Sequence, residues 1–340
     1  MPKERHSDTL RTASLLVPTL NEARYIGNCL DSLVAQDYEP EAIDLVVIDG
    51  GSTDHTCDIV KDYTKQFGRI RLLHNPKRRQ SAAYNIGIAE TRGDFVLVIV
   101  AHAIYERGYV RKCIDFLEQS GADNVGGVQF AKSSSYLGTA IALATCSRFG
   151  VGDATFRYAK TATSVESVFG GTWRRTTLEA IGGFNEDLPI SEDYELNYRI
   201  RQRGGKIIAS PDIHVAYCCR DSVRGVARQY FRYGYWKLSM IIVHPRSIRW
   251  RNLVPPVFVV MLLASAAIAH RSIQGALVAP GVYLLANLIV SVVVARKRDL
   301  RCVFVLPAIF VVMHLCWGAG FLWGALLNGW RHLNSDKSQR

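Results

Sequence analysis

The sequence predicts an α/β protein with a mostly parallel sheet, followed by a helix at a membrane surface and then by membrane-crossing helices. In roughly the first hundred residues, apolar runs of strand length alternate with amphipathic stretches, which is typical of a parallel sheet with helices on both faces. From Leu253 to Ala295 the only formal charge is Arg271, and from Cys302 to Trp330 there is none. Both stretches are long enough to cross hydrocarbon.

The predicted elements of the first part follow in a regular order. We expect strands at residues 13–20, 43–52, 70–75 and 94–100, and helices at residues 22–36, 55–67 and 81–91. The strands are nearly continuous apolar runs, as expected for strands buried on both faces. Because ligands of such sheets lie at the carboxyl ends of strands, residues 21–22, 49–54 and 101–105 should converge on one crevice.

The second part predicts about three membrane spans, near Val254–Ala269, Ile273–Ala295 and Cys302–Leu327. The first is short and begins with two prolines, so an alternative has it lying in the interface with only two spans crossing. A further alternative makes the apolar stretches buried helices of a soluble protein. We expect a first domain at residues 1–222, an amphipathic interfacial segment at 223–252, the spans within 253–330 and a polar tail at 331–340.

Charge and cysteine usage predict the cellular location. The amino terminus is polar and lacks an apolar signal core, and basic clusters flank the first span and separate the second from the third. The positive-inside rule therefore predicts a multi-pass protein of the inner or plasma membrane, with its first domain in the cytoplasm. The net charge of +11 divides into +5 before Leu253 and +6 from there on, which favours anionic headgroups as partners and not nucleic acid. Eight scattered cysteines are typical of reduced thiols.

Acidic side chains stand at the ends of the first two predicted strands. Glu22 follows "VPTLN", and Asp49 closes "IDLVVI" before two glycines that let the backbone approach a ligand. Taken alone, Glu22 could cap the next helix and Asp49 could form an Asx-turn. Their shared position at strand ends favours a binding crevice.

Together these stretches resemble family 2 glycosyltransferases, which have the GT-A nucleotide-sugar-binding fold. The family's "P-x-x-N-E" and "D-D/G-G-S-T-D" segments match "PTLNE" and "DGGSTD" here. The resemblance extends over nearly the whole chain and is nearest to the ExoA-like branch, which builds succinoglycan-type exopolysaccharides. It implies that the nucleotide-sugar donor is bound by a set of residues in these motifs and one further on: Pro18, Glu22, Asp49, Ser52, Asp54 and Arg232.

The segment "FGGTWRRTTLEAIGGFNEDLPISEDYELNYRIRQRG" looks like the acceptor segment of the same family. Asp193 is the best placed catalytic base, because it falls in the first turn of a helix after Ser191, a plausible N-cap, and a helix amino terminus favours an ionised carboxylate. The resemblance assigns Trp173 and Glu192 to acceptor binding. Without it, paired acids are ordinary residues of a first helical turn.

The stretch "RQYFRYGYWK" resembles the Q-x-x-R-W/Y motif of membrane-bound members. Gln229, Arg232 and Tyr233 fall on one helical face. Arg232 is expected to pair with the departing diphosphate, and Gln229 with Tyr233 to hold the acceptor sugar. The alternative is an interfacial anchor without a role in the chemistry.

One motif departs from the family pattern. Where the fourth strand should end in D-x-D, the sequence reads Val100-Ala101-His102, and the ExoA-like branch has D-A-H there. A divalent cation (Mn²⁺ or Mg²⁺) with His102 as its protein ligand remains the expected cofactor, because imidazole binds transition ions such as Mn²⁺. The other interpretation of Val100 is a catalytically inactive protein that binds another transferase.

The sequence therefore predicts an inverting glycosyltransferase that moves a sugar from a nucleotide donor, by default UDP-glucose, to a lipid-linked or growing saccharide. Other polysaccharide-synthesis proteins are possible partners. Two alternatives stay open: transfer to a polyprenyl phosphate itself, and a non-catalytic subunit of a membrane synthase complex.

Overall fold

A computed structural model describes residues 11–132, 135–152, 154–188, 190–218 and 221–337. The chain divides into two compact units. The first comprises Met1–Phe130 and Ala159–Tyr217, and the second comprises Ala131–Tyr158 and Cys218–Arg340. Each is described by itself.

The first unit is built on one sheet with the strand order β3-β2-β1-β4-β8-β6-β9-β5, and β7 pairs with β9. The strands are β1 Ala13–Thr19, β2 Ile43–Asp49, β3 Ile70–His74, β4 Phe95–Val98, β5 Ala103–Tyr105, β6 Asn124–Lys132, β7 Thr163–Ser164, β8 Phe169–Arg174 and β9 Ile207–Cys218. The first four run parallel, as predicted, with β1 between β2 and β4.

The second half of the sheet is antiparallel, so the sheet as a whole is mixed. β8 pairs with both β4 and β6, and β9 pairs with both β5 and β7. The predicted fourth strand is shorter than expected: β4 ends at Val98, and the chain turns before β5.

Helices cover both faces of the parallel strands. They are α1 Ile26–Val34, α2 Thr56–Gln66, α3 Gln80–Glu90, α4 Tyr109–Ser120, α7 Arg175–Ile181 and α8 Glu192–Gln202, with a 3-10 turn, η1, at Pro40–Ala42. One core joins Leu15 and Leu45 of the sheet to Leu30 of α1 and Leu117 of α4. Leu16 points to the other face, where α3 approaches so closely that a Cβ on Gly87 would lie 2.7 Å from its side chain.

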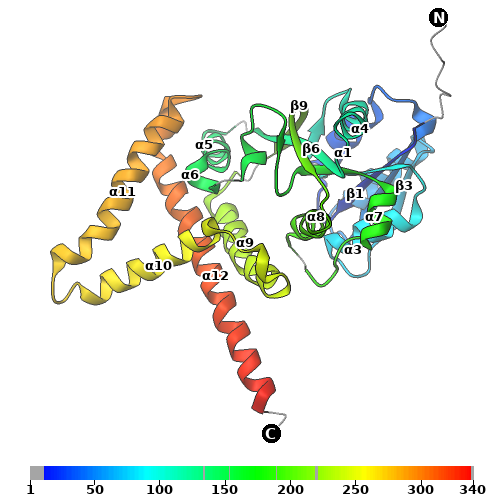
Figure 1. Cartoon of the computed structure of the whole chain (residues 1–340). Helices are drawn as coiled ribbons and strands as arrows, with labels where there is room; N and C mark the ends of the chain where they lie inside the picture. The colour runs from blue at the N-terminus through cyan, green and yellow to red at the C-terminus, as the bar shows by residue number, and fades with distance from the viewer. Residues whose placement is uncertain (1–10, 133–134, 153, 189, 219–220, 338–340) are drawn as a thin grey trace, which may run out of the picture. The chain divides into compact units, whose positions relative to one another are not determined.

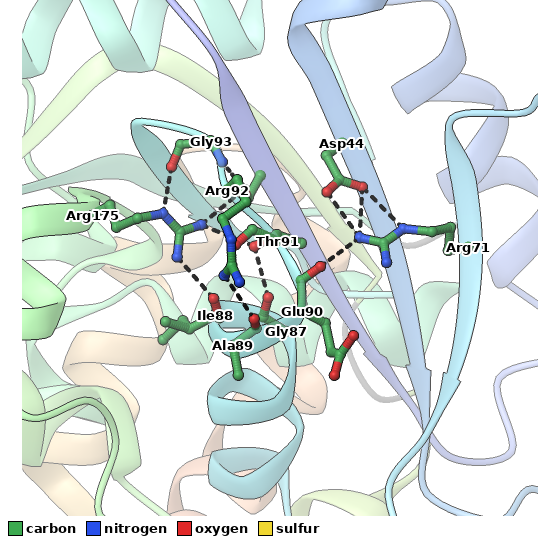
Figure 2. Close-up of polar contacts among 11 residues, drawn as sticks. Asp44, Arg71, Gly87, Ile88, Ala89, Glu90, Thr91, Arg92, Gly93 and Arg175 are labelled. Carbon is green, nitrogen blue, oxygen red and sulfur yellow. Dashed lines mark hydrogen bonds and ion pairs between the residues drawn. The ribbon is translucent and has the colours of Figure 1, made fainter.

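Arg175, the first residue of α7, connects α3 to the amino-terminal ends of β1 and β4 (Figure 2). Its guanidinium donates to the carbonyls of Gly93 at 2.7 Å and Ile88 at 2.8 Å, and to the hydroxyls of Thr91 at 2.9 Å and Ser14 at 3.2 Å. A cation at the end of a helix satisfies carbonyls that have no partner within the helix. Arg175 thus closes the carboxyl end of α3.

The second unit is helical (Figure 1). Its helices are α5 Tyr136–Thr145, α6 Arg148–Val151, α9 Val223–Val243, α10 Trp250–Ile268, α11 Ile273–Ala295 and α12 Leu306–Lys337, with 3-10 turns η2 Thr155–Arg157, η3 Pro245–Ser247 and η4 Leu300–Phe304. The backbones of α9 and α12 meet at glycines: a Cβ on Gly234 would lie 2.0 Å from the carbonyl oxygen of Trp317, and one on Gly320 would lie 2.1 Å from that of Phe231.

Three helices in the described part are long and apolar enough to cross a membrane, judged by length and composition: Trp250–Ile268, Ile273–Ala295 and Leu306–Leu327. They match the three spans predicted from sequence, although α10 begins four residues before the expected start. Its two prolines, Pro255 and Pro256, lie inside the helix. The predicted boundaries of the domains remain a prediction.

Candidate active site

The loops after β1 and β2 are joined by hydrogen bonds, so the two strand ends form one structure. The N–H of Asn21 donates to Ser52 Oγ, and the N–H of Thr53 donates to Asn21 Oδ1, both at 2.8 Å. Asp54 accepts from the N–H of Ala23 at 3.1 Å. Asn21 has a φ of +57°, in the left-handed region that side chains other than glycine seldom adopt. The side chains of Ser52 and Asp54, both predicted to bind donor, therefore hold these two loops together.

Asp49 lies at the centre of the joined loops, where it is 5% exposed. Its carboxylate accepts from the N–H groups of Gly51 at 2.8 Å and Ser52 at 2.9 Å, and also from the Ser52 hydroxyl. Burial alone would raise the pKa of Asp49, but these hydrogen bonds to the ionised form outweigh it, and the net effect lowers the pKa. Asp49 thus forms the Asx-type turn considered from sequence and is held as an anion.

Glu22 and His102 form a side-chain pair. His102 Nδ1 lies 3.0 Å from Glu22 Oε1, and the two side chains are 21% and 20% exposed. The rings of Tyr25 and Tyr217 lie 6.2 Å and 5.2 Å from the imidazole ring. The structure therefore brings together a residue predicted to bind donor and the residue predicted to bind metal.

Val100 fills the place of the first acid of the family motif with apolar packing. Its partly buried side chain packs against the core shared by the sheet, α1 and α4. Its backbone is fixed as well, because its N–H donates to the Tyr105 hydroxyl at 2.7 Å and its carbonyl accepts from the N–H of Ala103 at 3.1 Å. Val100 thus contributes apolar contacts, and its backbone hydrogen bonds hold the turn that leads to His102.

The described residues contain no group of three or more His, Cys, Asp or Glu side chains that could hold a metal ion. His102 and Glu22 offer one imidazole and one carboxylate. A cation that bridges phosphates needs only one or two protein ligands, because phosphate oxygens and water fill its other positions. The pair therefore fits a cation that arrives with a diphosphate, and it does not fit a metal site made by the protein alone.

Asp193 lies in the first turn of α8, as predicted, and accepts a hydrogen bond from the Ser167 hydroxyl at 3.3 Å. Ser191 is the N-cap residue, but its φ is +71° and its side chain makes no capping hydrogen bond. The expected cap is thus absent, and Ser191 instead places the helix start in a conformation that costs free energy for a residue other than glycine.

Glu192 is buried, unlike its neighbour Asp193. Burial, together with the negative charge of Asp193, raises the pKa of Glu192 to about 8. The surroundings therefore favour the protonated form of Glu192. A carboxyl whose pKa is raised by burial and by a neighbouring charge is typical of catalytic sites.

Two other predicted site residues belong to the sheet. Trp173 is 1% exposed and pairs with Val96 of β4, and its assignment to acceptor binding stays a prediction. Pro18 lies near the carboxyl end of β1, opposite Ile48 of β2. Contact of Pro18 with donor stays a prediction.

A model of glycosyl transferase family 2 matches residues 14–176. The succinoglycan biosynthesis protein ExoA of Rhizobium meliloti (strain 1021) is 30% identical over 331 residues, which cover 95% of this chain and 98% of that protein. The chain belongs to glycosyltransferase family 2. A dolichyl N-acetyl-α-D-glucosaminyl phosphate 3-β-D-2,3-diacetamido-2,3-dideoxy-β-D-glucuronosyltransferase of Methanococcus voltae is also 30% identical over 321 residues, covering 92% of this chain and 97% of that one.

Solved structures confirm the GT-A fold predicted for this glycosyltransferase. The mannosyltransferase PcManGT from Pyrobaculum calidifontis, solved with GDP-Man and Mn²⁺, superposes with a TM-score of 0.60 at 20% identity, over 92% of this chain and 87% of that one. Residues 1–349 of TarS from S. aureus give a TM-score of 0.50 at 16% identity, over 88% and 90% of the two chains. At these identities the likeness concerns the fold alone.

The Q-x-x-R-Y residues of the glycosyltransferase lie on α9, in the second unit. Gln229 donates to the Tyr233 hydroxyl at 2.8 Å, and Arg232 is exposed. The predicted i, i+4 contact is therefore present. The assignments of Arg232 to the diphosphate and of Gln229 with Tyr233 to the acceptor remain predictions.

Sequence reasoning missed two features of this glycosyltransferase. Arg78 lies beside Gly51, to whose carbonyl it donates at 3.3 Å, and it has a φ of +55°. The basic run Lys77-Arg78-Arg79 after the third strand was a signal for it. The second feature is Ser167, which donates to Asp193, together with Asn197, whose Nδ2 donates to Ser167 Oγ at 3.0 Å. Neither residue carried such a signal, because an isolated Ser and Asn fit no motif.

Proposed function

We propose that this glycosyltransferase is an inverting enzyme that moves a sugar from a nucleotide-diphosphate donor to a saccharide hydroxyl, on a lipid-linked or growing chain, at the cytoplasmic face of a membrane. The observation that carries the proposal is Asp193, which sits in the first turn of α8 and is hydrogen-bonded by Ser167. A helix amino terminus and a donated hydrogen bond both favour the ionised carboxylate that a base needs.

In the proposed reaction, an acceptor hydroxyl attacks the anomeric carbon from the face opposite the nucleotide. The new C–O bond forms as the bond to the diphosphate breaks, and Asp193 takes the proton of the hydroxyl. The nucleoside diphosphate leaves with the bonding electron pair, so the anomeric configuration inverts. Asp49, in its loop of Ser52 and Asp54, is proposed to hold the nucleotide.

His102 is proposed to hold a divalent cation, Mn²⁺ or Mg²⁺, that neutralises charge on the departing diphosphate when bound. Glu22, 3.0 Å from His102 Nδ1, would hold the imidazole ring through that nitrogen and leave Nε2 as the one available to a cation. This arrangement offers a physical reason why a chain with Val100 in place of an acid can remain a transferase. Arg232 is proposed to add positive charge at the same leaving group.

The acceptor proposal rests on the two long relatives. One is named as a succinoglycan biosynthesis protein, and the other as a transferase acting on a sugar already attached to dolichyl phosphate. A saccharide hydroxyl needs a base, whereas a polyprenyl phosphate is already an anion. The first-turn carboxylate Asp193 therefore favours a saccharide acceptor over polyprenyl phosphate itself.

Donor binding by the full-length protein in detergent tests the donor and the cation. UDP-glucose, UDP-galactose and GDP-mannose would be titrated with Mn²⁺ and with chelator. We expect one donor to bind with a Kd that weakens at least tenfold with chelator. Binding of no donor by folded protein would instead support the non-catalytic alternative.

The base is tested separately. Asp193→Asn is expected to lower kcat by at least about a thousandfold, within the range attributed to general base catalysis, while donor affinity stays within twofold of the parent. Ser210→Ala, which alters a buried serine of β9, is the matched control. Parent-like turnover by Asp193→Asn would show that the base is another group.

A further inference from the structure

A chain of buried polar side chains leads from the middle of the sheet to Asp193. Thr172 of β8, Asn124 of β6 and Asn197 of α8 are each 0% exposed, and Ser167 is 3% exposed. Buried amides destabilise a protein unless each is hydrogen-bonded. The two buried amides, Asn124 and Asn197, are linked by hydrogen bonds to the candidate base, and we therefore ask whether they serve the reaction.

The direction of every hydrogen bond in this chain is fixed from its inner end. The N–H of Thr172 can only donate, and it donates to Asn124 Oδ1 at 3.0 Å. Asn124 must then present its amide nitrogen to Asn197 Oδ1, at 2.7 Å. Asn197 in turn presents Nδ2 to Ser167 Oγ, at 3.0 Å.

The last link follows from the number of protons that a hydroxyl carries. Because Ser167 Oγ already accepts from Asn197, its single proton is available for Asp193 Oδ2, which lies 3.3 Å away. A donor aimed at a carboxylate favours its ionised form. A chain of the opposite polarity would favour the protonated acid, which cannot act as a base.

We infer that Ser167, oriented by Asn197 and Asn124, is a positioning residue that keeps Asp193 ionised and aimed for removal of the acceptor proton. The inference rests on the proposed function, since it needs Asp193 to be the base. It adds a residue outside the sequence motifs of the family to the machinery of the reaction. Ser167 touches the base and need not touch substrate.

The titratable groups around Asp193 allow the effect to be recognised. Among the described residues they include Glu192 and Tyr194 on α8 and Tyr84 on α3, and the Tyr194 hydroxyl donates to Glu166 at 3.2 Å. Burial raises the pKa of both Glu192 and Tyr84, so neither titrates on the acid limb of a rate profile.

The test is the pH dependence of kcat/KM for full-length protein in detergent, with the donor and acceptor that the parent uses. Ser167→Ala is expected to move the acid limb up by about one pH unit, because a hydrogen bond to the ionised base is lost. Ser167→Thr keeps the hydroxyl and should restore the parent profile. Ser167→Cys fills the same space with a weak donor and should behave like alanine, which guards against a variant that fails to fold.

Ser210→Ala and Ser210→Cys, at another buried serine, are the controls and should keep the parent profile. A parent-like acid limb in both Ser167→Ala and Ser167→Cys, alongside an inactive Asp193→Asn, would overturn the inference and leave the proposed function intact. An active Asp193→Asn would overturn both.

Discussion

At the scale of single residues, the site separates two adjacent acids by their surroundings. Asp193 receives the directed hydrogen bond of Ser167, whereas Glu192 is buried beside that negative charge and has its pKa raised. The unfolded chain would titrate Glu192 near the ordinary value of 4.5. Between about pH 4.5 and about pH 8, the folded protein therefore holds a proton on Glu192 that the unfolded chain releases.

Glu192→Gln is predicted to stabilise the protein at alkaline pH. A raised folded-state pKa contributes stability below about pH 4.5 that is lost as pH rises through about 8. The neutral amide removes this loss, so the unfolding temperature of the variant should exceed that of the parent by about 5 °C at pH 9 and by little at pH 5. Thermal unfolding in detergent across this range measures the difference.

Glu186 provides a control, because its pKa shift is opposite to that of Glu192: hydrogen bonds from Lys77 and Asn85 lower the pKa of Glu186. Its contribution to stability is present above about pH 4.5 and is lost as pH falls, so Glu186→Gln should destabilise the protein at neutral pH. A Glu192→Gln variant with the same pH dependence as the parent would show that Glu192 is ionised in the fold.

The sequence predicted which residues gather at the crevice better than how they meet. Glu22, Asp49 and His102 lie at strand ends that are adjacent in the sheet, a consequence of parallel topology. The pairing of Glu22 with His102 depends on a turn after β4 that no local pattern specified. Ser167 and Asn197 were missed because a hydrogen-bond chain between distant residues leaves no periodicity to detect.

At the scale of elements, α3 depends on an arginine that begins another helix. Arg175→Met is predicted to lower the free energy of unfolding by about 3 kcal/mol, because it leaves the carbonyls of Gly93 and Ile88 without their donor. Arg71→Met is the matched comparison in the same region (Figure 2). Arg71 pairs with Asp44 at a partly exposed site and donates one hydrogen bond to the carbonyl of Glu90, so its loss should cost less than that of Arg175, about 1 kcal/mol. Denaturant unfolding that ranks the two variants equally would contradict the role of Arg175.

Elements were predictable where their contacts are local. The strands and helices up to Val98 appear in the predicted order, because each alternation of strand and helix is written in consecutive residues. The antiparallel partners β8 and β9 come from far along the chain, and their pairing depends on the finished sheet. Trp173 is an example. It is buried because β8 pairs with β4, and the sequence alone does not show this pairing. Successive residues of a strand point to opposite faces, so neighbouring residues of one motif can differ in burial.

At the scale of the whole molecule, the chain leaves one unit and returns to it. Residues 131–158 belong to the helical unit, although the first unit lies on both sides of them in sequence. There α5 shares a core with α9, α11 and α12, through Ile141, Tyr230 and Phe310 among others. Its apolar character is explained by its packing against the other helices of its unit.

The membrane topology separates the three-span and two-span interpretations. With three spans, the turn at 269–272 lies outside the cytoplasm and the basic turn at 296–299 lies within it, as the positive-inside rule favours. With α10 in the interface, the two turns exchange sides. We predict that a protease site inserted at 296–299 is cut in inverted vesicles, and that one inserted at 269–272 is cut in right-side-out vesicles. The reverse result would place α10 along the membrane surface and put Arg296, Lys297 and Arg298 outside, against the charge rule.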